Sequence, residues 1–178
     1  MIDIETLGQT PGCAIYQIAA VEFCPDEFIT GKEFCINIHP KSSEMIGLHT
    51  EEPTLEWHRQ RGVEPDALNG HCVRYAFQEF ARFLTEEISP QQYWCKSTSF
   101  DFPALEHVFR LLDGAPPWKY WQQYDMRTVW NLAFPGRKTP PAPHTALADC
   151  HEQIKQLATA NDRIIETCVI PLTFYDGG

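Results

Sequence analysis

The sequence contains no apolar stretch approaching the roughly 20 uninterrupted residues of a membrane span. It opens Met1-Ile2-Asp3, with neither a basic leader nor an apolar run. Its seven cysteines are an odd number, and no two of them form a C-x-x-C pair, which fits neither a disulfide framework nor a zinc cluster. These absences predict a cytoplasmic protein with reduced thiols and no membrane partner.

Basic residues are scarce as well. Lysine and arginine number 14 against 24 aspartates and glutamates, which gives a net charge of -10 at pH 7. Passive binders of nucleic acid or anionic membranes gain affinity from a positive field, so this balance argues against that class. It leaves an enzyme open, because carboxylates that converge on divalent cations make the ions the largest charges in the site.

The length and composition predict one globular domain over residues 1–178. Hydrophobic residues make up 43% and charged residues 21% of the 178 positions, which excludes a disordered or low-complexity chain. This length lies within the usual size of a single domain, and the sequence contains no internal repeat, linker or like-charge run.

Hydrophobic periodicity predicts an opening run of strands, followed by alternating helices and short strands. The expected strands are 2–6, 14–23 and 33–38, with two short ones at 92–95 and 121–126. The expected helices are 73–84, 105–112 behind a candidate cap at Ser99, and 146–168. This order indicates an α/β fold with a mixed central sheet of about five strands flanked by helices.

Two acidic residues share one face of the first predicted strand. Because side chains of a strand alternate between its faces, Asp3 and Glu5 point the same way while Ile2 and Ile4 point into the core. Two like charges this close repel unless a cation lies between them, and hard oxygen ligands suit Mg²⁺ or Mn²⁺. Taken alone, the pair is more typical of a solvated strand edge than of a metal site.

Two further segments carry candidate site residues. Asp101 begins a predicted helix, where an aspartate also has the plain role of complementing the helix dipole. His144 leaves a proline-rich loop, and Asp149 lies in the first turns of the longest predicted helix. Positions i and i+5 are about 140° apart on a helix, so these two residues can face one site only if His144 precedes the helix.

Three ordered motifs carry a resemblance to a known family. Residues 3–8 (DIETLG), 99–101 (SFD) and 144–149 (H-x4-D) resemble the motifs of the DEDDh 3′ to 5′ exonucleases of the RNase H-like superfamily. Residues 54–57 (TLEW) and 118–128 (WKYWQQYDMRT) are similar to segments of the phage and prophage exonuclease VIII-like branch. One departure is Lys96, which with the preceding cysteine stands where this branch often has Gly-Asn.

The resemblance implies an RNase H-like fold and a specific set of roles. Asp3, Glu5, Asp101 and Asp149 would hold two ions, Mg²⁺ or Mn²⁺, in a two-metal site. His144 would act as the general base, a role suited to an imidazole of ordinary pKa near 6.5. The expected reaction releases nucleoside 5′-monophosphates from the 3′ end of single-stranded DNA or RNA, or of a 3′ overhang. Such a protein belongs in the cytosol of a bacterium or of a phage-infected host.

Other residues fit two interpretations each. Thr6 and Leu7 match family positions that contact the terminal nucleotide, but Leu7 is also a suitable core residue at a strand end. Arg137 and Lys138 lie in the loop before His144, where they fit either substrate phosphate or solvent. Trp57 fits either base stacking or the margin of the core.

Two rival functions remain open on the sequence. One is a nucleic-acid-binding or accessory subunit that keeps the fold and has no turnover. The other is a hydrolase of short oligonucleotides. The sequence leaves the choice between RNA and DNA open, because no motif reveals a contact to a 2′-hydroxyl. It leaves the oligomeric state open as well.

Overall fold

The computed structural model describes residues 1–64, 69–141 and 143–168. The expected domain of 1–178 therefore extends over residues 65–68, 142 and 169–178, which lie outside the described residues. The strands are β1 (Ile2–Thr6), β2 (Ile15–Phe23), β3 (Thr30–Asn37), β4 (Tyr93–Cys95) and β5 (Gln123–Asp125). The helices are α1 (Pro40–Glu44), α2 (Glu52–Arg59), α3 (Val73–Arg82), α4 (Asp101–Leu111), α5 (Met126–Ala133) and α6 (Ala146–Cys168), with short helical turns at Phe83–Ile88 and Tyr120–Gln122.

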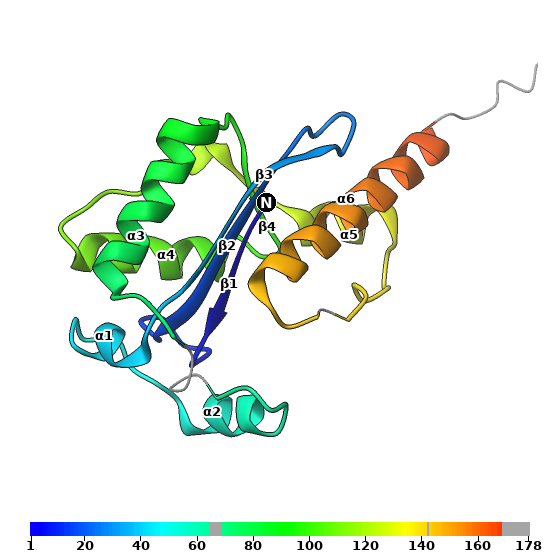
Figure 1. The fold of residues 1–178 in the computed structure, drawn as a ribbon. Helices are drawn as coiled ribbons and strands as arrows, with labels where there is room; N and C mark the ends of the chain where they lie inside the picture. Colours follow the sequence, from blue (N-terminus) through cyan, green and yellow to red (C-terminus); the bar gives the residue numbers. More distant parts are fainter. Residues whose placement is uncertain (65–68, 142, 169–178) are drawn as a thin grey trace, which may run out of the picture.

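The first three strands form an antiparallel sheet in the order β1-β2-β3. In its register, Asp3 lies opposite Ala19 and Glu5 opposite Gln17. The pairing shifts between Glu5 and Thr6, so the regular ladder ends directly after the second carboxylate. Figure 1 shows these strands running through the middle of the molecule.

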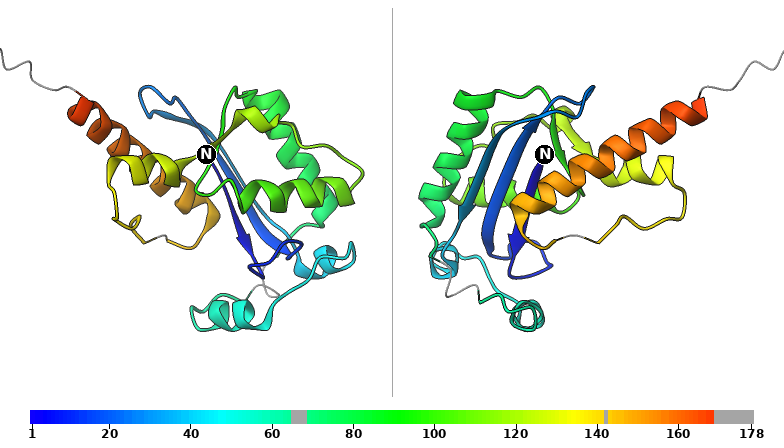
Figure 2. Two further views of the ribbon diagram at one scale, coloured as in Figure 1. Left: turned by 180° about the vertical axis from the view of Figure 1, so that it is seen from behind. Right: turned by 45° about the vertical axis from the view of Figure 1, so that its right-hand side comes forward.

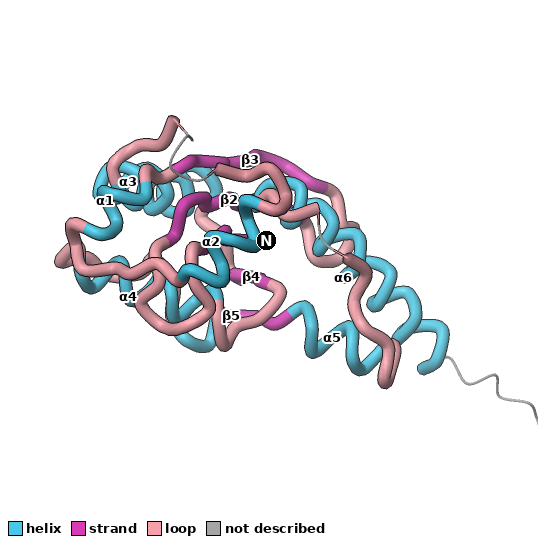
Figure 3. Tube along the Cα trace, turned by 90° about the horizontal axis from the view of Figure 1, so that it is seen from below, coloured by secondary structure: helices cyan, strands magenta, loops and turns pink. Residues whose placement is uncertain are grey.

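The remaining two strands form a parallel pair of their own. Tyr93 pairs with Gln123 and Cys95 with Asp125. Figure 3 shows β4 and β5 continuing the row of strands on the side away from β3, and β4 contacts β1. The prediction of one five-stranded sheet is corrected here to a three-stranded and a two-stranded sheet. With only three residues, β4 has few backbone groups for pairing, and its ladder goes to β5.

Helices cover both faces of the three-stranded sheet (Figure 2). On one side α3 and α4 pack on Ile2, Ile4 and Ile18, and on the other α5 and α6 pack on Ala19 and Val21. Neighbouring residues of β2 thus contribute to different cores, as expected for side chains that alternate along a strand. No helix within the described ranges is long and apolar enough to cross a membrane.

The predicted helix before residue 112 begins at Asp101, as expected, but without the predicted cap. Helix α4 begins at Asp101, and Phe100 occupies the N-cap position without a side-chain hydrogen bond to the helix. The hydroxyl of Ser99, the predicted cap, instead lies 3.1 Å from that of Ser97. The loop that ends β4 is therefore held by other contacts.

Asp125 supplies those contacts. Its carboxylate caps α5 by accepting a hydrogen bond of 2.7 Å from the amide of Thr128. It also accepts a hydrogen bond of 2.9 Å from the amide of Thr98. Burial opposes ionisation of this carboxyl group, yet the hydrogen bonds from Thr98 and Thr128 outweigh it and lower its pKa. One side chain thus joins the start of α5 to the loop that leads to Asp101.

Replacing Asp125 by alanine removes these two hydrogen bonds and a third, of 3.2 Å, which the carboxylate accepts from the hydroxyl of Thr98. We expect Asp125→Ala to lower the free energy of unfolding by about 1–3 kcal/mol, because it removes a helix cap and leaves a half-buried amide without its partner. Urea denaturation followed by circular dichroism measures the change. Asp26→Ala, at an exposed position, is the matched control and should stay within about 0.5 kcal/mol of the wild type. Equal midpoints for the two variants would contradict the role of Asp125.

Candidate active site

β1 places two carboxylates on the side of the sheet that faces α6. Ile2 and Ile4 pack in the core beneath α3 and α4, as predicted, while the side chain of Asp3 meets α6. Glu5 follows on the same face, one strand repeat further on. The sequence pattern therefore correctly predicted which face of the strand carries the acidic pair.

α6 contributes the third carboxylate from its first turns. The helix begins at Ala146, so His144 lies before it, which is the condition that the sequence set for a shared site. The backbone at His144 has φ 63°, in the left-handed region that a side chain rarely adopts. Its amide donates a hydrogen bond of 3.2 Å to Oδ1 of Asp149. This turn brings the two residues to one cavity.

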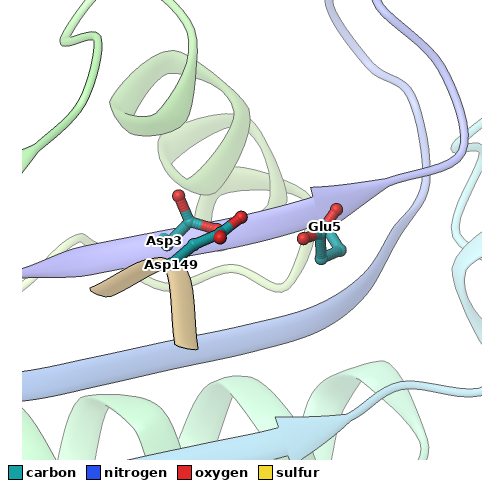
Figure 4. A group of neighbouring side chains, drawn as sticks. All are labelled: Asp3, Glu5 and Asp149. Atoms are coloured by element: carbon teal, nitrogen blue, oxygen red, sulfur yellow. The ribbon is translucent and has the colours of Figure 1, made fainter. Parts of the chain in front are cut away.

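Figure 4 shows Asp3, Glu5 and Asp149 together. One carboxylate oxygen from each of the three lies within 4.8 Å of the others. Asp101, from the first residue of α4, lines the same cavity of about 550 Å³, as does His144. The structure therefore brings all five predicted catalytic residues to one cavity, which we call the acidic cavity.

The environment raises the pKa of all four carboxyl groups. Burial is the largest cause in each case, and Asp3, Asp101 and Asp149 are only 8%, 6% and 6% exposed. Burial and the charges of Asp149 and Asp101 raise the pKa of Glu5 to about 7. Burial raises the pKa of Asp101 to about 7, although hydrogen bonds to this carboxyl group act to lower it. Burial and the charges of the neighbouring carboxylates raise the pKa of Asp3 well above its usual range.

This donor set fits divalent cations. Buried carboxylates at these separations repel one another, and bound cations remove that repulsion. Their hard oxygen atoms are the ligands that Mg²⁺ and Mn²⁺ prefer. Lys96 and Arg127 also line the acidic cavity, but neither forms an ion pair within 4.0 Å among the residues that the structure describes.

Gln153 is a site residue that the sequence analysis missed. It lies one helical turn after Asp149 on α6 and is 2% exposed. Its Nε2 donates a hydrogen bond of 2.6 Å to Oδ1 of Asp3, while its Oε1 is buried without a partner in the described part of the chain. Spacing offers a signal for it, because residues i and i+4 share a helix face. Gln153 fixes the orientation of a candidate metal ligand.

We expect Gln153→Leu to weaken Mn²⁺ binding by about 10- to 100-fold, because partners that orient a metal ligand contribute on this scale. Calorimetric titration of Mn²⁺ measures the affinity. Gln156→Leu is the matched control: Gln156 is buried on the same helix, but its Nε2 donates to Glu152 and not to a candidate ligand. If both variants bind Mn²⁺ as the wild type does, Gln153 has no part in the site.

Helix α2 contacts the side chain of His144. The rings of Trp57 and His144 meet edge to face, with centroids 5.0 Å apart. The guanidinium of Arg61 lies 3.7 Å from the centroid of the Trp57 ring. Next to Trp57, the buried His58 places Nε2 3.0 Å from the carbonyl oxygen of Thr6 and so ties α2 to the end of β1. This tie sets Trp57 beside His144.

The predicted substrate-binding residues lie in different places. Thr6 lines a second cavity of about 540 Å³ with Glu5, Trp57 and Phe100, which we call the aromatic cavity. Leu7 is 1% exposed and packs in the hydrophobic core, so its side chain reaches no cavity. Of its two interpretations, the structure favours the core, because the chain turns back to pair with Ala14 at this point.

Arg137 and Lys138 line a third cavity of about 780 Å³, together with Lys96 and Arg127. We call it the basic cavity. Lys96 and Arg127 also line the acidic cavity, so the two adjoin. The loop that carries Arg137 is held to α5, since Nε1 of Trp130 donates to the carbonyl oxygen of Arg137 at 3.1 Å.

The fold and site define a mixed α/β protein with an acidic cavity whose buried carboxylates suit divalent cations. Residues 1–161 match the model of the family described as "3'-5' exoribonuclease Rv2179c-like domain", and the chain belongs to this family. The predicted enzyme class is thereby confirmed: the chain is an exonuclease.

The chain is also similar to a curated relative and to a solved structure. An exodeoxyribonuclease of Enterobacteria phage T4 is 27% identical over 158 aligned residues, which cover 72% of this chain and 68% of the relative. Among solved structures, exonuclease X in complex with 5′ overhanging duplex DNA superposes with a TM-score of 0.56. That match covers 95% of this chain and 92% of the other at 18% identity, so it shows a shared fold.

Proposed function

We propose that this protein is a metal-dependent 3′ to 5′ exonuclease of the DEDDh type with an RNase H-like fold, which releases nucleoside 5′-monophosphates. The convergence of Asp3, Glu5, Asp101, Asp149 and His144 on the acidic cavity carries this proposal. Four carboxylates can hold two divalent ions for phosphodiester hydrolysis, and an imidazole can accept the proton of the attacking water. The family match over residues 1–161 supports the same reaction class.

The four carboxylates would hold two Mg²⁺ or Mn²⁺ ions. When bound there, such ions activate the attacking water and stabilise the leaving 3′ oxygen. His144 accepts the proton of that water at an imidazole nitrogen, for which it is suitably exposed to the cavity. Its ring contact with Trp57 and its amide bond to Asp149 hold it beside the carboxylates.

The aromatic cavity suits the terminal nucleotide. It adjoins the acidic cavity through Glu5 and Phe100, and the half-buried Trp57 forms part of its lining. A base can stack on such aromatic groups regardless of sequence. With the terminal nucleoside in this cavity, the phosphate to be cleaved lies at the acidic cavity, and one nucleotide leaves in each cycle.

Digestion of matched 5′-labelled single-stranded RNA and DNA with Mn²⁺ tests the proposal. We expect a ladder that shortens from the 3′ end and is absent with EDTA and in Asp3→Asn. The rate ratio of the two strands gives the sugar preference. Binding without shortening would favour the accessory subunit, and cleavage of dinucleotides alone would favour the short-substrate hydrolase.

A further inference from the structure

The basic cavity concentrates positive charge on an acidic protein. Lys96 enters it from the end of β4, Arg127 from α5, and Arg137 and Lys138 from the loop after α5. Its lining contains no aspartate or glutamate. On a chain with a net charge of -10, four cations around one cavity of about 780 Å³ form a local positive field.

None of these four cations forms an ion pair within 4.0 Å in the described ranges, although Arg127 and Lys96 are close enough to Asp101 and Asp149 to act against the rise in the pKa of those carboxyl groups. Every ion pair within 4.0 Å in this part of the chain involves other residues. The guanidinium of Arg137 lies 5.9 Å from the ring centroid of Phe134, a contact that does not neutralise its charge. Unpaired cations lining a cavity fit an anion, and a row of them fits a polyanion.

The order of the three cavities indicates which anion the basic cavity would bind. The basic cavity adjoins the acidic cavity through Lys96 and Arg127, and the aromatic cavity adjoins it through Glu5 and Phe100. The basic and aromatic cavities share no lining residue, and Figure 3 shows α5 and α2, which contribute to them, well apart. The acidic cavity therefore lies between a place for the terminal nucleoside and a place for further phosphates.

We propose that the basic cavity binds the phosphates on the 5′ side of the bond to be cleaved, so that the preferred substrate is a strand longer than a dinucleotide. This inference rests on the proposed exonuclease function. A dinucleotide has no phosphate beyond the one at the acidic cavity, whereas each added nucleotide brings a phosphate toward Arg137 and Lys138. Substrate length thus becomes a determinant of specificity.

Kinetics on a dinucleotide and on a twelve-nucleotide single strand test the inference. We expect kcat/KM for the longer strand to exceed that for the dinucleotide by about tenfold or more at low salt. In Arg137→Gln/Lys138→Gln this ratio should fall by about five- to tenfold, and the salt slope for the longer strand by about 1.4. Lys41→Gln/Arg110→Gln, which neutralises two exposed cations outside the three cavities, should keep the wild-type ratio.

Fluorescence anisotropy of a 5′-labelled strand in EDTA adds a readout that needs no turnover. The Arg137→Gln/Lys138→Gln variant should bind the strand about tenfold more weakly than the wild type at low salt. Equal cleavage of dinucleotide and long strand would overturn the inference and leave the exonuclease intact. If nothing is cleaved, the proposed function fails, and the anisotropy still decides: equal affinity of variant and wild type overturns the basic cavity as a strand site.

Discussion

His144→Ala should lower kcat by a factor of about 10²–10⁴ and leave Mn²⁺ binding unchanged. General bases contribute on this scale, and the histidine side chain is not among the grouped carboxylate ligands. Its amide, which bonds to Asp149, is retained in the variant. Steady-state rates on a single strand and calorimetric Mn²⁺ titration measure the two quantities.

Added imidazole gives this prediction a second readout. Because His144 is exposed, the space left by the substitution is open to solvent, and free imidazole should restore part of the lost rate. His71→Ala, at another exposed histidine that lines none of the three cavities, should behave as the wild type. A kcat for His144→Ala within threefold of the wild type would contradict the assignment of His144 as the base.

Asp3→Asn should be more stable than the wild type when divalent metal is removed. The pKa of Asp3 is raised well above its usual range by burial and by the charges of Asp101 and Glu5. In the folded state the protonated form of Asp3 is therefore favoured. The wild type loses stability as the pH rises from the pKa of aspartate in the unfolded chain, near 4, through the raised pKa of Asp3 in the folded state. At about pH 8 in EDTA we expect the variant to melt roughly 5–10 °C higher.

The pH dependence of the difference in melting temperature between Asp3→Asn and the wild type separates the titration of Asp3 from that of other groups. The gap between variant and wild type should widen from about pH 5 to pH 8, while groups common to both proteins cancel. Added Mn²⁺ should raise the melting temperature of the wild type more than that of Asp3→Asn. A gap that is constant with pH would contradict the burial of charge at Asp3.

Much of the site followed from local sequence patterns. Strand alternation predicted the shared face of Asp3 and Glu5, and the prolines before residue 144 predicted that His144 precedes α6. The three longer strands and α6 lie close to their expected bounds, because strong hydrophobic periodicity decides such elements. Local signals were sufficient wherever one element fixed the geometry.

The remainder depends on contacts between distant elements. The hydrogen bond from Gln153 to Asp3 joins residues 150 positions apart, and the basic cavity combines the end of β4 with the loop after α5. The break between the two sheets was likewise beyond pattern analysis, since strand pairing depends on which short segments meet. The burial of Leu7 in the core also depends on such contacts, and the sequence left it open.

Calorimetric titration of Mn²⁺ into the metal-free protein tests the central claim, that Asp3, Glu5, Asp101 and Asp149 hold divalent ions. The account predicts two bound ions per chain for the wild type and for the exposed control Asp26→Asn, and at least tenfold weaker binding for Asp149→Asn. No Mn²⁺ binding by the wild type, or unchanged affinity and stoichiometry in Asp149→Asn, would contradict it.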